Sequence, residues 1–208
     1  MEKEGISAFR KHLVIFIPII LVVVGLLVYP SDKSETETTK AYEKTDTESE
    51  TNESLSVETD YISIEDKFYL KVPGNFKRLD DEIIAEKYNG DVPDIVFSNE
   101  EVNINIAVSF TENQMADSQI KEYKEYMETL FEYAGEVVGT DYYTVDHHNI
   151  GQIKVISEAV DTQIYNNVIF FSYDNKLVLI SFNCTEALKD EWGDVGDSII
   201  GSLSFNNE

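Results

Sequence analysis

Hydrophobic and polar positions divide the chain into three parts. Residues 13–29 form one uninterrupted apolar run, residues 30–60 are almost entirely polar, and residues 61–208 combine short apolar runs with periodic patterns. The apolar run is typical of a membrane helix, the polar stretch buries too little surface to fold, and the mixed patterns favour a globular domain. The sequence therefore predicts an anchor, a linker and one folded domain.

The apolar run from Leu13 to Tyr29 has seventeen residues and no charge. As a helix it would extend roughly 25 Å, slightly less than the ~30 Å hydrocarbon core of a bilayer. Lys11 and His12 can reach the interface from one end, and Tyr29 lies where interfacial aromatic residues are favoured. We therefore expect the chain to contact a membrane through Leu13–Tyr29, as a single-pass transmembrane helix.

The charges beside this run predict its orientation. Lys3, Arg10 and Lys11 precede it, whereas residues 31–60 carry ten acidic residues and three lysines. By the positive-inside rule, residues 1–12 form a short cytoplasmic segment and the C-terminal domain is extracytoplasmic. The competing interpretation is a cleaved signal peptide, but no clear pair of small residues follows the run. We expect an uncleaved signal-anchor in the cell membrane, and whether the segment is cleaved stays open.

The segment from 30 to 60 is predicted to be a disordered acidic linker. Residues 31–60 contain twelve Ser or Thr and ten acidic residues, without Gly or Pro. Such a composition cannot offset the entropy of ordering, and repulsion between carboxylates extends the chain. The linker would hold the domain at residues 61–208 away from the membrane.

The pattern in residues 61–208 predicts helices and antiparallel strands. Helices are expected where apolar residues recur every three or four positions, at 80–88, 117–133 and 186–203. Strands are expected at 61–64, 68–72, 95–98, 102–110, 137–145, 150–159, 163–173 and 176–183. Asp174-Asn175 supplies the turn of the last hairpin.

Two strands predict how the layers are arranged. Val168 to Phe171 and Leu177 to Ile180 are consecutive apolar residues, without alternation. Consecutive apolar residues in a strand indicate that both faces of the sheet are covered. The helices at 117–133 and 186–203 are available for this, so we expect an α+β fold with an antiparallel sheet and helices on both faces.

The charge balance restricts the class of partner. The chain has 40 acidic and 16 basic residues, a formal charge of −24, and only two arginines. This surface repels nucleic-acid phosphates, so we expect no nucleic-acid partner. It suits cationic ligands or basic proteins. The one cysteine, Cys184, ends an apolar strand and is interpreted as a small core residue.

Two groups of residues could bind a metal ion. His147 and His148 adjoin Asp146 and could ligate zinc or manganese, with Asp141 also near in sequence. The alternative is that both histidines are solvated residues at a hairpin tip. The second group is acidic and has helical spacing: Asp190, Glu191, Asp194 and Asp197. These residues could hold a weakly bound hard cation, or they could form the solvent-exposed face of the last helix.

No residue is assigned to catalysis, a cofactor or a metal. The chain lacks a G-x-S-x-G elbow, a P-loop, an H-E-x-x-H motif and a C-x-x-C pair. Because catalytic groups can assemble from distant residues, this absence alone does not exclude an enzyme. We expect a protein that is not an enzyme and needs no cofactor.

The folded domain resembles the PsbP-like superfamily over residues 61–208. The resemblance lies in the order of the elements and in the segments FYLKVPGNFK, DIVFSN, VNINIAVSF and SIIGSLSF. This superfamily includes photosystem-associated PsbP proteins and bacterial DcrB-type envelope lipoproteins. It implies an α/β/α sandwich and a non-enzymatic accessory or binding role outside the cytoplasm. The chain departs from that group by a membrane helix where a lipid or transit peptide would be.

These expectations converge on one function with two alternatives. We expect a membrane-anchored, extracytoplasmic binding or accessory domain that contacts another envelope protein or a small ligand. The first alternative is a divalent-cation-binding envelope protein, and the second is an unrecognised hydrolase. The ligand, the partner, the oligomeric state and the physiological role do not follow from the sequence.

Overall fold

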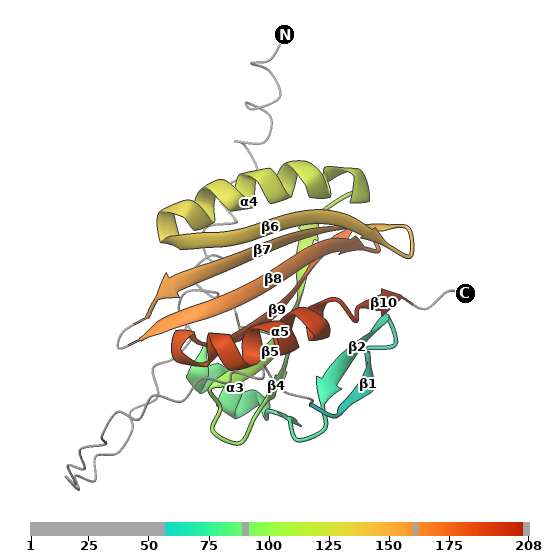
Figure 1. Cartoon of the computed structure of the whole chain (residues 1–208). Helices are drawn as coiled ribbons and strands as arrows, with labels where there is room; N and C mark the ends of the chain where they lie inside the picture. Colours follow the sequence, from blue (N-terminus) through green and yellow to red (C-terminus); the bar gives the residue numbers. More distant parts are fainter. Residues whose placement is uncertain (1–56, 89–91, 160–161, 206–208) are drawn as a thin grey trace, which may run out of the picture.

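The structure, a computed structural model, describes residues 57–88, 92–159 and 162–205 (Figure 1). The predicted transmembrane helix at 13–29 and nearly all of the predicted linker lie outside these residues. Within the three described ranges, no helix is both long and apolar enough to cross a membrane.

Two antiparallel sheets form the framework. The large sheet has seven strands in the order β3-β4-β5-β9-β8-β7-β6. These strands are β3 (Lys77–Arg78), β4 (Ile95–Ser98), β5 (Ile104–Gln114), β6 (Gly135–Val145), β7 (His148–Glu158), β8 (Gln163–Tyr173) and β9 (Lys176–Thr185). The small sheet has the order β1-β2-β10 and consists of β1 (Thr59–Ile64), β2 (Phe68–Pro73) and β10 (Ser204–Phe205).

Tight turns join three of the strand pairs, with two residues in the β6–β7 and β8–β9 connections and three, Glu65 to Lys67, between β1 and β2. In each turn two consecutive residues have positive φ, the geometry of a type I′ turn, which matches the twist of the strands that it joins. The three pairs are Glu65-Asp66, Asp146-His147 and Asp174-Asn175. The predicted turn at Asp174-Asn175 is therefore confirmed.

The helices cover both faces of the large sheet, as the sequence predicts. Helix α4 (Ile120–Ala134) packs on β6, β7 and β8, and α5 (Lys189–Ile200) packs on β8 and β9 (Figure 1). Along β8, Val168 and Phe170 belong to the core under α4, whereas Ile169 and Phe171 belong to the core on the α5 side. Each apolar run thus supplies both cores at once.

The third helix, α3 (Asp81–Lys87), lies on the same face as α4. Its Ile84 packs with Val96 and Ala107. In the register of the sheet, Ala107 is opposite Ser181, which is opposite Val168 of the core under α4. Residues paired across a sheet share a face. The opposite face carries α5 and the small sheet.

Some bounds differ from the predicted ones. The last helix ends at Ile200 rather than at residue 203, and Leu203 leads into β10, which pairs with β2. This pairing joins residues that are far apart in sequence, so no local pattern predicts it. Val102, predicted to begin a strand, has φ 57° and lies in the turn before β5, and β7 begins at His148 rather than at the predicted residue 150.

Candidate functional site

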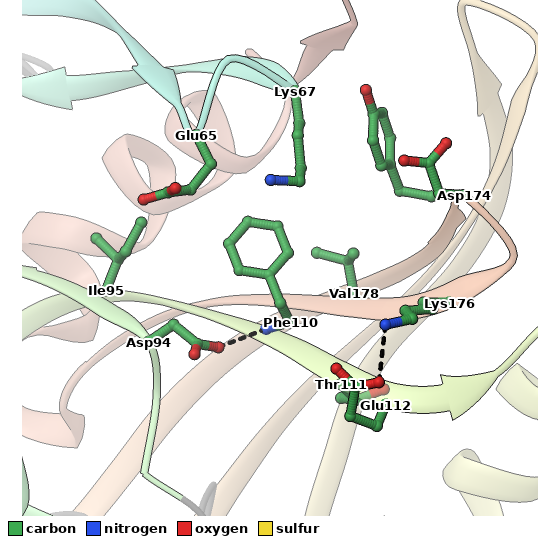
Figure 2. A pocket seen from close by; sticks show the side chains of 11 residues that line it. Glu65, Lys67, Asp94, Ile95, Phe110, Thr111, Glu112, Asp174, Lys176 and Val178 are labelled. Carbon is green, nitrogen blue, oxygen red and sulfur yellow. Dashed lines mark hydrogen bonds and ion pairs between the residues drawn. The ribbon is translucent and has the colours of Figure 1, made fainter.

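A cleft of about 510 Å³ opens between the small sheet and the large sheet (Figure 2). Its walls come from four places in the chain. They are the turn after β1, the start of β4, the C-terminal half of β5, and the β8–β9 hairpin. Three of these places are strand ends or turns, which carry polar side chains on a rigid support.

The floor of the cleft is apolar. Ile95 and Val178 are buried, and Phe110 is half-buried with its ring centroid 6.0 Å from that of Phe68. All three belong to the core on the α5 side of the sheet or pack against it. Ile95 and Val178 are only 3% and 2% exposed, so the cleft reaches this core mainly through Phe110.

Charged side chains surround this floor. Four carboxylates and two ammonium groups line the cleft, which gives a formal charge of −2. They are Glu65, Asp94, Glu112 and Asp174, with Lys67 and Lys176. Because carboxylates outnumber ammonium groups, the net charge of the rim is negative and attracts counter-ions. The rim therefore favours a cationic ligand.

Several of these groups contact one another. The Lys67 Nζ lies 5.0 Å from the centroid of the Phe110 ring, and Figure 2 shows this side chain reaching toward the ring. The Phe110 backbone N–H donates to Asp94 Oδ2 at 2.7 Å, and Lys176 Nζ donates to Glu112 Oε2 at 2.7 Å. The rim is thus pre-organised by its own side chains.

This cleft is absent from the expectations based on sequence. Its residues come from distant segments, and the acidic ones resemble the many other exposed carboxylates of the chain. The one available signal is Phe110, which ends the alternating run of β5 at the point where the core meets solvent. Only the pairing of the strands brings this ring beside Lys67.

The two histidines considered as metal ligands lie in different environments. His147 is exposed in its turn, whereas the His148 ring is stacked on Phe205 and its Nδ1 lies 3.1 Å from the Ser172 carbonyl oxygen. Asp146 Oδ2 accepts the Phe205 backbone N–H at 3.1 Å. In the part of the chain that the structure describes, no three His, Cys, Asp or Glu side chains are grouped to hold a metal ion.

The predicted acidic group on the last helix lines a second cavity, of about 340 Å³. Asp190, Asp194 and Asp197 border it, and Glu191 is not among its lining residues. Asp197 accepts from Lys154 Nζ at 2.5 Å and from the Asn167 amide at 2.8 Å. Because its carboxylate already has a cationic partner, this group does not offer a cation three free acidic ligands.

Lys87 and Cys184 are buried titratable groups that lie outside both cavities. Lys87 Nζ donates to the Val102 carbonyl and to Asn105 Oδ1, each at 2.7 Å, and burial lowers its pKa to about 8. Cys184 is fully buried, as expected for a core residue. Burial, together with the charge of Glu186, raises the thiol pKa to about 12, so the thiol stays protonated at neutral pH.

Comparison with known proteins identifies the fold. No family model matches the sequence, and no curated protein does. The solution structure of the cyanobacterial PsbP protein CyanoP from Synechocystis matches with a TM-score of 0.52 and 13% identity, over 76% of this chain and 98% of that one. The chain has a PsbP-like fold. This is the fold expected from the sequence resemblance, although identity at this level shows the fold alone.

Two further solved structures overlap the PsbP-like domain less closely. LpqN, which is involved in cell envelope biogenesis of Mycobacterium tuberculosis, has a TM-score of 0.48 and 10% identity, over 67% of this chain and 83% of its own. The Ran-binding protein Mog1p of Saccharomyces cerevisiae has a TM-score of 0.41 and 12% identity, over 72% and 96%.

Proposed function

We propose that this chain is a non-catalytic binding or accessory domain, held on the outer side of a membrane, and that its ligand site is the cleft between the two sheets. The observation that carries the proposal is the cleft itself, in which the half-buried Phe110 ring and its buried apolar neighbours lie beneath a charged rim. Ligand sites commonly combine apolar walls with a few placed polar groups. The PsbP-like fold supplies the scaffold.

The contacts of the cleft residues favour binding over catalysis. The Thr111 hydroxyl donates to the Leu177 carbonyl at 2.9 Å, so it is oriented toward the backbone rather than toward a base. Lys176 is paired with Glu112. A nucleophile needs a neighbouring base within hydrogen-bonding distance, and these contacts use the side chains in another way.

The proposed location depends on the N-terminal sequence. Leu13–Tyr29 is long and apolar enough to anchor the chain, and its basic flank favours a cytoplasmic N-terminus. An acidic linker would then keep the domain away from the membrane surface and leave the cleft accessible. The acidity of the whole chain also suits a basic partner.

A photocrosslinking amino acid in the cleft tests the site. Glu112 is suitable, because its side chain is 90% exposed at the mouth of the cleft. The matched control is exposed Glu132 on α4, on the opposite face of the sheet. In intact cells we expect an adduct, resolved by gel shift or intact mass, at position 112 and not at 132. No adduct at 112, or equal adducts at both positions, would overturn the proposed site.

The location has a separate test. Protease added to intact cells should remove the C-terminal domain, and the full-length protein should enter the soluble fraction only with detergent. A cytoplasmic protein of known location serves as the control for intact cells. Protection of the domain in intact cells would overturn the proposed location, without affecting the cleft as a binding site.

A further inference from the structure

We propose that the cleft binds a primary ammonium group on a flexible alkyl stem, with the ammonium over the Phe110 ring and the stem on the apolar floor. This inference rests on the proposed function, because it names the ligand class of the same cleft. The ligand chemistry is shared by free alkyl amines and by lysine side chains of proteins.

The position of Lys67 carries the inference. This side chain leaves the β1–β2 turn and places its ammonium 5.0 Å from the Phe110 ring centroid, inside the cleft (Figure 2). An ammonium at this distance from a ring face is attracted by the ring quadrupole. The ring therefore accommodates an alkylammonium, and an external ammonium binds there by displacing that of Lys67, which competes with the ligand.

Charge makes an external cation favourable there. The rim has two more carboxylates than ammonium groups, and Lys176 is already paired with Glu112. Glu65 stands on the small-sheet side of the cleft and Asp174 on the hairpin side (Figure 2). Lys67 stands between them, and a cation that displaces its ammonium meets negative potential on both sides.

The apolar floor distinguishes a stemmed ammonium from a bare cation. A hard metal ion needs several oxygen ligands at short distance. Around this cleft, as elsewhere in the described ranges, no three acidic side chains are grouped for that purpose. An alkyl stem instead lies against the half-buried rings of Phe110 and Tyr173 while its charged end stays at the rim, as lysine stems do on protein surfaces.

Titration calorimetry on the full-length protein in neutral detergent tests this ligand class. The probes are 1,5-diaminopentane and, as its uncharged counterpart, 1,5-pentanediol. The lysine source is represented by acetyl-Gly-Lys-Gly-amide, with the norleucine tripeptide as its uncharged counterpart. We expect binding of at least one ammonium probe at low ionic strength, and no binding of either uncharged counterpart.

Three variants locate the contact. Lys67→Met removes the competing ammonium from the ring face and should tighten binding of the ammonium probe by about twofold to fivefold, the range of an exposed cation–π contact. Lys121→Met on α4 removes the same charge away from the cleft and should change binding less. Phe110→Leu should weaken binding by a similar factor. If circular dichroism shows that Phe110→Leu does not fold, the comparison of Lys67→Met with Lys121→Met is sufficient to test whether the ammonium binds at this ring.

The outcomes separate the two proposals. Binding of the diamine alone indicates a free amine, and binding of the lysine tripeptide alone indicates a protein side chain; either supports the inference. Absence of binding by both ammonium probes, or equal effects of Lys67→Met and Lys121→Met, overturns it. If the photocrosslinker at position 112 still captures a ligand in that case, the cleft is a binding site for another class of molecule and the proposed function stands.

Discussion

The imidazole of His148 is stacked on the ring of Phe205, with centroids 3.9 Å apart and planes inclined by 23°. This contact joins the first residue of β7 to the last residue of β10, and so links the large sheet to the small one. Phe205 also meets Phe171 edge-on, with centroids 5.2 Å apart. The histidine that the sequence offered as a metal ligand thus packs between the sheets.

We predict that the two adjacent histidines differ in their effect on stability. His148→Ala should lower the free energy of unfolding by about 1–2 kcal/mol, because an aromatic pair and its buried area are lost. His147 is exposed with φ 71°, so His147→Gly should raise stability by about 1 kcal/mol. Urea unfolding followed by circular dichroism measures both, and equal effects would contradict the stacking role of His148.

Two glycines of α5 should respond in opposite directions to alanine. A Cβ on Gly196 would lie 2.4 Å from the ring of Phe182, whereas on Gly193 it would meet nothing closer than Lys189 Cγ at 3.9 Å. We expect Gly196→Ala to destabilise the domain by about 1–3 kcal/mol through overpacking. Gly193→Ala should stabilise it by about 0.5–1 kcal/mol through helix propensity.

Thermal unfolding of the two variants side by side checks this pair. Helix propensity alone would raise the melting temperature of both, since both positions are in the same helix. A stabilised Gly196→Ala variant would therefore show that α5 does not pack on Phe182 as closely as the structure places it.

The main strands and helices could be predicted because their residues form patterns over short stretches of sequence. In Val168 to Phe171, four consecutive apolar residues require two covered faces, and the structure places alternate members in the two cores. The turn at Asp174-Asn175 and the helix through Ile120, Tyr123 and Met127 likewise follow from residues close in sequence. Local spacing is enough where neighbours in sequence share one environment.

The cleft could not be predicted, because its residues become neighbours only through the sheet. Lys67 and Phe110 are 43 positions apart, and the contact between them depends on how the small sheet lies against β5. The same holds for β10, whose Ser204 pairs with Tyr69 across most of the domain. A two-residue strand of this kind has no periodic signal of its own.

The reactivity of Cys184 should report unfolding. Its thiol is fully buried, so a reagent cannot reach it in the folded state. Burial also raises its pKa to about 12, so the reactive thiolate is not formed near neutral pH. We expect no labelling by a thiol reagent such as iodoacetamide at pH 8, and complete labelling in urea. Mass spectrometry counts the adduct on this single cysteine. Rapid labelling without denaturant would contradict the burial of β9.

Lys87 should make stability depend on pH in the alkaline range. Burial lowers its pKa from 10.5 to about 8 in the folded chain, and unfolding restores the ordinary value. Between pH 8 and 10.5 the unfolded state therefore binds more protons, so the free energy of unfolding rises with pH. A shift of this size corresponds to about 3 kcal/mol at most.

The matched variant is Lys87→Met, which keeps the length of the stem and removes the titrating group. Tyrosines with raised pKa values, such as Tyr143, oppose the rise at high pH, but they are common to both proteins and cancel in the difference. We expect the stability of the native sequence relative to Lys87→Met to increase steadily from pH 8 to 10, measured by urea unfolding at each pH. A difference that is constant over this range would mean that Lys87 stays charged in the folded state, held by the Val102 carbonyl and Asn105.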